Sequence, residues 1–237
     1  MSAPGLQTKN VFLTGGAQGL GKSYLDSLLA AGASVVFGDI NPTVGAATEQ
    51  ELAQKHGQAK VKFIELDVTD GAKFEAAFQS AVERLGHVDL MVNNAGFMVE
   101  SLWEKMIQLN YAGVVRGTFL AYEHMRKDRG GRGGRIVNIS SEFVKPGSSR
   151  LVDQRSIICA TWHPFSLVEA SQAKSDNVTV ERVQSAFMKL VLLQEMNGAI
   201  LYVPLHEMNF YKMEKVNLGD SWPVKVKDGA SPSTASS

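Results

Sequence analysis

Short apolar runs alternate with amphipathic helical patterns from residue 11 to residue 139. The runs predict strands over residues 11–13, 35–39, 61–66, 88–92 and 135–139. Apolar residues that recur at three- and four-residue spacing predict helices over residues 20–31, 42–56, 74–85 and 101–127. Strands that alternate with helices in this way favour parallel βαβ units. We therefore predict one α/β domain on a single doubly wound parallel sheet of about seven strands.

Two further elements are predicted nearer the C-terminus. An amphipathic pattern predicts a helix over 178–194, and an apolar run over 199–203 predicts a last strand ended by Pro204. From about residue 217 the chain turns to Gly, Pro, Ser and Lys. We therefore expect a domain over residues 1–216 and a flexible tail over 217–237.

A glycine-rich stretch joins the first predicted strand to the first predicted helix. Residues 14–21 read TGGAQGLG, with glycines spaced G-x-x-x-G-x-G. Glycines allow a tight turn and a close approach to phosphates, and the helix N-terminus offers free N–H groups. A structural turn is the alternative that such a loop leaves open by itself. We predict a dinucleotide pyrophosphate site made by Gly15, Gln18, Gly19, Leu20 and Gly21.

Polar side chains follow three of the predicted strands at the point where each strand ends. Asp39 ends the second, Asp67 follows the third and Asn94 follows the fourth. A carboxylate at Asp39 can accept hydrogen bonds from a ribose diol and would repel a 2′-phosphate, which favours NAD. These polar residues could also simply mark loop starts. With their neighbours, the predicted adenosine-side contacts are Asp39, Ile40, Asp67, Val68 and Asn94.

Composition narrows the function classes. The chain has 237 residues, 44% of them hydrophobic, and no net charge, so we expect neither a nucleic-acid partner nor an anionic membrane surface. The basic segment 126–135 is diluted by glycines and is predicted to be a solvated loop. The single cysteine, Cys159, forms no internal disulfide and is predicted to be a buried thiol. No metal site, secretory signal or membrane span is predicted, so a cytoplasmic protein is expected.

Residues 10–141 resemble the short-chain dehydrogenase/reductase family. The resemblance rests on TGGAQGLG at 14–21, Asp39, Asp67-Val68, NNAG at 93–96, Asn110 and IVNISS at 136–141. It implies a Rossmann-like fold and hydride transfer between NAD(H) and a secondary alcohol or ketone. Segments 103–105, 108–110, 130–134 and 196–200 are similar to the NAD-dependent members that act on hydroxy-lipids. The resemblance also implies two catalytic residues, Ser141 for the substrate oxygen and Asn110 for a water link to a lysine.

The family's Tyr-x-x-x-Lys pair is missing where the resemblance places it. Such a pair shares one helix face, so that the lysine lowers the tyrosine pKa toward working pH. Residues 146–155 contain no tyrosine, and an apolar run at 156–159 predicts that strand 6 begins at once. The crossover over 142–155 is poor helix material, so we predict its helix to be reduced or absent. An apolar patch left uncovered there would favour a partner or aggregation.

Three other sets of residues resemble a substitute for the missing pair, and none of them is predicted to replace it. Tyr211 and Lys215 have the right spacing, but they follow the last predicted strand. Tyr122 and Arg126 are interpreted as a surface pair on the long helix. His163 is interpreted as a loop residue.

Three hypotheses remain open at this point. The chain is an NAD-dependent short-chain oxidoreductase with impaired catalysis, or it is an inactive NAD-binding pseudoenzyme. The second could act in a homodimer or as the partner subunit of an intact relative. The third is a truncated splice or gene-model product.

Overall fold

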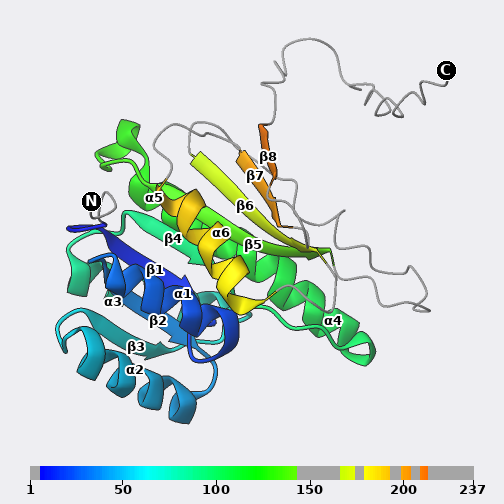
Figure 1. Cartoon of the computed structure of the whole chain (residues 1–237), viewed down its shortest axis with the longest axis horizontal. Helices are drawn as coiled ribbons and strands as arrows, with labels where there is room; N and C mark the ends of the chain where they lie inside the picture. Colours follow the sequence, from blue (N-terminus) through cyan, green and yellow to red (C-terminus); the bar gives the residue numbers. More distant parts are fainter. Residues whose placement is uncertain (1–5, 143–165, 174–178, 193–198, 204–208, 213–237) are drawn as a thin grey trace.

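The computed structural model describes residues 6–142, 166–173, 179–192, 199–203 and 209–212. They form three layers, with one sheet between two layers of helices (Figure 1). In these residues the sheet has eight strands in the order β3-β2-β1-β4-β5-β6-β7-β8. Neighbouring strands are parallel except β7 and β8, which are antiparallel. The predicted doubly wound, Rossmann-like α/β fold is confirmed, with one strand added at the β7 edge.

The strands are β1 (Asn10–Thr14), β2 (Ser34–Asp39), β3 (Val61–Glu65), β4 (Leu90–Asn93), β5 (Arg135–Glu142), β6 (Ser166–Ala173), β7 (Ala199–Val203) and β8 (Asn209–Lys212). The α-helices are α1 (Gly19–Ala30), α2 (Pro42–His56), α3 (Gly71–Leu85), α4 (Trp103–Met106), α5 (Val114–Met125) and α6 (Val180–Leu192). Shorter segments are the 3-10 turns η1 (Glu100–Leu102) and η3 (Lys127–Arg129) and the π-helical η2 (Ile107–Gly113).

The two faces of the sheet carry separate apolar cores. Val11 and Leu13 pack with residues of α1, α2 and α6, whereas Phe12 packs with residues of α3 and α5. This alternation follows from the two-residue period of a strand, which sends successive side chains to opposite faces. A strand buried on both faces must be apolar throughout, as the continuous run 11–13 is.

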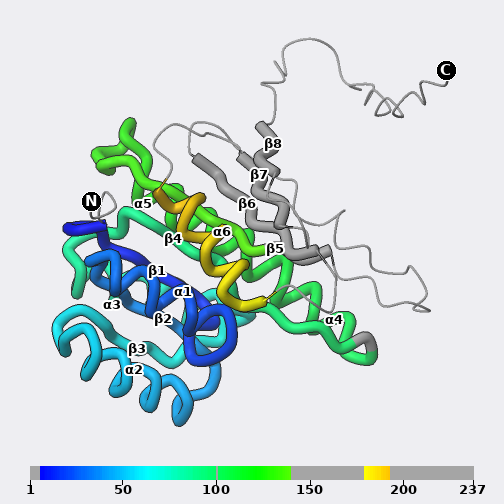
Figure 2. The backbone as a smooth tube through the Cα atoms, viewed as in Figure 1, coloured from blue at the N-terminus to red at the C-terminus, as the bar shows by residue number. Residues whose placement is uncertain are grey.

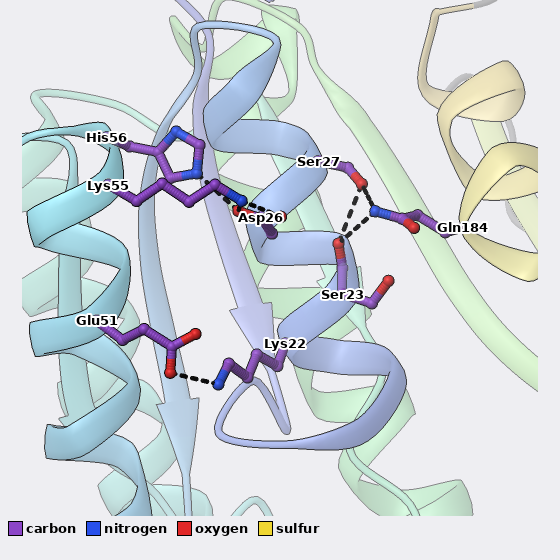
Figure 3. Close-up of polar contacts among 8 residues, drawn as sticks. All are labelled: Lys22, Ser23, Asp26, Ser27, Glu51, Lys55, His56 and Gln184. Atoms are coloured by element: carbon purple, nitrogen blue, oxygen red, sulfur yellow. Dashed lines mark hydrogen bonds and ion pairs between the residues drawn. The ribbon is translucent and has the colours of Figure 1, made fainter. Parts of the chain in front are cut away.

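Helix α6 lies beside α1, although the two are far apart in the sequence (Figure 2). The Phe187 ring stacks on Tyr24 of α1, with ring centroids 4.2 Å apart. The Gln184 Nε2 amide donates to the Ser23 carbonyl at 3.2 Å and to the Ser27 hydroxyl (Figure 3). These contacts dock the C-terminal helix on the N-terminal half of the fold.

The helix predicted over 101–127 is interrupted in the structure. It divides into η1, α4, the π-helical η2 and α5, which ends at Met125. The apolar pattern misses this because Gly113 is the only fully buried residue of η2, so the segment adds no fully buried apolar side chain whose spacing could reveal the wider turns. π-helical turns are rare and often lie at functional sites, and this one contains Asn110.

The C-terminal region differs from the prediction in two strands. The strand that pairs with β5 is β6, at Ser166–Ala173, where no strand was predicted. Tyr211 does not follow the last strand, because it lies in β8 and pairs with Ile200 of β7. These two strands were not predicted because they form by pairing with distant segments. Their short sequences of mixed polar and apolar residues give little local indication of a strand. Several predictions fall outside the described residues: strand 156–159, the reduced crossover helix, Cys159, His163, Lys215 and the tail 217–237.

Two expectations from composition can be compared with the structure. In the basic segment 126–135, residues 127–130 and 132 are exposed, as expected of a solvated loop, and Arg126 forms ion pairs with Glu123 at 2.9 Å and Asp128 at 2.6 Å. Within the described residues, no helix combines the length and apolarity needed to cross a membrane.

Helix α5 carries a half-buried histidine, His124, whose protonation should matter for stability. The His124 Nε2 atom accepts a hydrogen bond from the Val88 backbone N–H at 3.1 Å, which requires a neutral ring. Burial lowers the His124 pKa, and the neighbouring charge of His87 lowers it further. A lowered folded-state pKa means that the unfolded chain binds this proton more readily.

We therefore expect the free energy of unfolding to fall as the pH drops from about 6.5 through the lowered His124 pKa. Urea denaturation between about pH 7.5 and pH 5.5 measures this loss. In His124→Gln, which keeps an acceptor for Val88 but does not titrate, the loss should be smaller. An equal pH slope in both proteins would contradict the assignment to His124.

Candidate functional site

The carboxyl ends of β1 to β4 open onto a cleft of about 620 Å³. Parallel α/β sheets bind ligands at this edge. The predicted cofactor residues line the cleft, apart from Gly19: Gly15, Gln18, Leu20, Gly21, Asp39, Ile40, Asp67, Val68 and Asn94. The structure thus brings together residues spread over about 80 positions of the sequence, because the strand ends share one edge.

The glycine-rich turn between β1 and α1 has no room for a side chain at Gly15 or Gly21. Gly15 has φ +71°, and a Cβ on it would lie 2.8 Å from the Ala95 Cα atom. A Cβ on Gly21 would lie 1.9 Å from the Gly15 carbonyl oxygen. The turn therefore requires glycine at both positions, and it leads directly into the N-terminus of α1. This bare backbone at a helix N-terminus fits a pyrophosphate.

Asn94 holds the turn in place. Its Nδ2 amide donates to the carbonyls of Thr14 at 3.0 Å and Gly15 at 2.8 Å. In return, the Thr14 hydroxyl accepts from the backbone N–H groups of Asn94 and Ala95, both at 3.1 Å. The sequence predicted that Asn94 contacts the ligand, and the structure adds that its amide group ties β4 to the turn.

Asp39, at the end of β2, faces the same turn. One carboxylate oxygen accepts from the Ala17 backbone N–H at 2.9 Å, and the other accepts from the Asn41 N–H at 3.1 Å. Each oxygen keeps a lone pair for a further donor. The carboxylate is therefore fixed at the cleft wall, where it can accept from ribose hydroxyls.

Asp67, after β3, is held as an anion. One oxygen accepts from the Thr69 backbone N–H at 2.9 Å and from the Thr69 hydroxyl at 2.7 Å. Burial raises the Asp67 pKa, but these bonds and the nearby Lys105 and Lys73 outweigh it, so the pKa lies below its ordinary value. The Asp67 carboxylate is therefore held in position by Thr69 of the same loop and remains charged at neutral pH.

Sequence reasoning missed the second wall of the cleft. Lys105 of α4 lines it, together with the apolar side chains of Leu102 and Leu109. Their spacing of three and four residues was a usable signal, because it places them on one helix face. Apolar walls with one cation suit a flat base next to an anionic group.

Asn110, a predicted catalytic residue, lies in η2 and forms hydrogen bonds with the segment after β4. Its Oδ1 accepts from the Phe97 N–H at 3.1 Å, and its Nδ2 donates to the Phe97 carbonyl at 2.9 Å. Phe97 itself lines the cleft. In this arrangement Asn110 shapes the cleft through Phe97.

Ser141, the other predicted catalytic residue, lies near the carboxyl end of β5 and pairs with Gln172 of β6. The candidate substitute Tyr211 pairs with Ile200, which pairs with Glu169. Tyr211 is therefore three strand spacings from β5, roughly 14 Å. This register supports the interpretation of the Tyr211–Lys215 match as a coincidence.

The second substitute pair lies at the other end of the sheet. Tyr122 and Arg126 stand at the C-terminal end of α5, where the Arg126 guanidinium lies 5.1 Å from the Tyr122 ring centroid. The chain continues from there into the start of β5, opposite the end that carries Ser141. The predicted surface pair thus lies away from the cleft.

Known proteins of one family are similar to this chain. The sequence profile of the short chain dehydrogenase family matches residues 9–197. NAD(+)-dependent 15-hydroxyprostaglandin dehydrogenase of Macaca fascicularis is 33% identical over 192 residues, which cover 78% of this chain and 70% of that protein. The Eggerthella lenta 3beta-hydroxysteroid dehydrogenase 2 is 35% identical over 147 residues, covering 58% and 55%.

A solved structure is similar to this chain in its fold. The short chain dehydrogenase from Mycobacterium smegmatis superposes with a TM-score of 0.69 at 21% identity, covering 87% of this chain and 96% of that one. The resemblance expected from the glycine turn and the strand-end motifs is confirmed. The protein is therefore a short-chain dehydrogenase family oxidoreductase, related to 15-hydroxyprostaglandin dehydrogenases and hydroxysteroid dehydrogenases.

Proposed function

We propose that the chain binds NAD and that it is an oxidoreductase of the 15-hydroxyprostaglandin dehydrogenase type with impaired catalysis. The observation that carries NAD binding is the fixed carboxylate of Asp39 beside the glycine turn in one cleft. A 2′-phosphate at this point would face like charge, which costs several kcal/mol, roughly 2–4. The 33% identical relatives bear NAD(+) in their names, which is consistent with this choice.

The proposed reaction is oxidation of a secondary alcohol, such as a hydroxy-lipid, or the reverse reduction of a ketone. Bound NAD⁺ would supply the acceptor for the hydride that leaves the alcohol carbon. The hydroxyl proton must pass to a base, and Ser141 would hold the substrate oxygen. Asn110 would act on the same side through a water link.

The weak point of this machinery is the base. The chain has five tyrosines, and none of them falls within residues 143–165, which follow Ser141. Loss of a general acid/base costs about 100- to 10,000-fold in rate. We therefore expect turnover that is at least about 100-fold slower than that of an intact relative.

Calorimetry with NAD and NADP tests the binding proposal. The wild-type chain should bind NAD and prefer it to NADP. In Asp39→Asn, which keeps the side-chain size, the preference should fall by roughly 30- to 1,000-fold because the repulsion of the 2′-phosphate is removed. A wild-type chain that is folded but does not bind NAD would overturn the proposal.

Turnover is measured by NADH absorbance with a panel of secondary alcohols. Slow or absent turnover with intact NAD binding supports impaired catalysis. Fast turnover would contradict it, and loss of that turnover in Tyr211→Phe would identify Tyr211 as the base after all.

A role as a partner subunit is the second candidate. The observation that favours it is a row of large apolar side chains exposed along α4, η2 and α5: Trp103, Ile107, Tyr111 and Phe119. Trp103, Ile107 and Tyr111 follow one another at four-residue steps, so each is a neighbour of the one before it along the helical segment. Sedimentation of the chain alone, and mixed with an intact relative, distinguishes a monomer from a homodimer or heterodimer.

A further inference from the structure

Ala17 of the glycine-rich turn is held from outside the turn through both of its backbone polar groups. The Ala17 N–H donates to the Asp39 carboxylate at 2.9 Å. The Ala17 carbonyl accepts from the Thr48 hydroxyl at 2.7 Å. Thr48 comes from the middle of α2 and is 3% exposed, so this bond has no competition from water.

The bond to the Ala17 carbonyl also orients the next amide. In a planar trans peptide the C=O and the following N–H point in opposite directions. Because the Ala17 carbonyl points to α2, the Gln18 N–H points away from α2. Gln18 lines the cleft and is the N-cap residue of α1, where N–H groups have no partner within the helix.

We propose that Thr48 is a positioning residue for the pyrophosphate of the dinucleotide. Its buried hydroxyl holds the Ala17–Gln18 peptide in the orientation that presents the Gln18 N–H to a phosphate oxygen. The inference rests on the proposed NAD function and assigns a part of it to α2. Without Thr48, the buried Ala17 carbonyl loses its partner and the peptide is free to rotate.

The polar contacts between α1 and α2 supply a control variant. Lys22 and Glu51 form an ion pair at 2.7 Å, and Asp26 pairs with Lys55 at 2.8 Å and His56 at 2.7 Å (Figure 3). Thr48, Glu51 and Lys55 share one face of α2. The Glu51 side chain is 61% exposed, so its ion pair contributes little. Glu51→Gln therefore changes a polar contact of the same face of α2 but leaves the hydrogen bond from Thr48 to the turn in place.

The test compares Thr48→Val, Thr48→Ser and Glu51→Gln by titration with NAD, ADP-ribose and adenosine. Thr48→Val, which keeps shape but not the hydroxyl, should weaken NAD and ADP-ribose by roughly 5- to 50-fold. Adenosine, which has no phosphate, should bind Thr48→Val as it binds the wild type. Thr48→Ser and Glu51→Gln should bind all three ligands within about threefold of the wild type.

Each other outcome is decisive. If Thr48→Val binds ADP-ribose like the wild type, the inference fails while the proposed function stands. Equal weakening of adenosine and ADP-ribose would show that Thr48 only supports the fold. A wild-type chain that binds none of the ligands would overturn both the inference and the proposed function.

A measurement on the wild type covers the case in which Thr48→Val does not fold. Sodium pyrophosphate is added while the backbone amide resonances are followed by NMR. The Gln18 amide should shift as the site fills. A Gln18 resonance that stays in place while other amides of the turn respond would overturn the inference.

Discussion

Gly21→Ala is expected to weaken NAD binding strongly without unfolding the protein. The added Cβ would lie 1.9 Å from the Gly15 carbonyl oxygen and 2.7 Å from the Asn94 Nδ2 atom, so the backbone of the turn must move. Such a displacement takes the N–H groups out of register with the pyrophosphate. The dissociation constant should rise by about 100-fold or more, equivalent to ~3 kcal/mol.

Calorimetry measures the loss of affinity, and circular dichroism confirms the fold of the variant. Gly86→Ala is the control for a strained glycine substitution away from the cleft, because Gly86 has φ +79°, which alanine rarely adopts, but a Cβ there meets nothing within 4 Å. It lies at the C-cap of α3 and should leave NAD binding unchanged. Wild-type affinity in Gly21→Ala would show that the turn does not hold the pyrophosphate.

Phe187→Ala is expected to destabilise the whole domain by about 3–5 kcal/mol. Phe187 is fully buried and stacks on Tyr24, so its removal leaves a cavity between α6 and α1. The midpoint of thermal unfolding should fall by roughly 6–20 °C in a chain of this size. A thermal melt followed by circular dichroism measures the shift.

This variant also tests whether the chain is a foldable product. Val180→Ala is the control on the same helix, because Val180 is 47% exposed and its truncation should shift the midpoint little. A single cooperative transition that Phe187→Ala lowers would show that α6 is part of one folded unit. An unchanged melt in Phe187→Ala, or a wild-type chain without a transition, would favour the truncated-product hypothesis.

Local patterns were sufficient for the first part of the fold. The apolar runs and the helical spacing predicted β1 to β5 and α1 to α3 within a few residues, since each element carries its own period. Helix starts were equally local: Asn41 caps α2 by accepting from the Val44 N–H at 3.1 Å, and Pro42 follows it. The predicted helix 178–194 likewise corresponds to α6.

The site could be predicted where its residues stand in motifs. Nine of the ten predicted cofactor residues line the cleft, because glycine spacing and strand-end positions are readable along the chain. Lys105 was missed although its spacing from Leu102 and Leu109 was a usable signal. Thr48 was missed because it reaches the turn from a helix whose packing the sequence does not report. The roles of Ser141 and Asn110 stay predictions until turnover is measured.

The sequence by itself determined the chemistry of the glycine-rich turn with Asp39, and the order of the first strands and helices of the fold. Bare glycines at a strand-to-helix turn and an acid at the next strand end are local choices, and their physical consequences are local too. Only the tertiary structure decided that β6 and β8 extend the sheet, that Tyr211 lies three strands from β5, and that α2 holds the turn through Thr48. Pairing and packing between distant segments depend on which surfaces come into contact in the folded chain. The spacing of apolar residues within a single strand or helix does not specify those contacts.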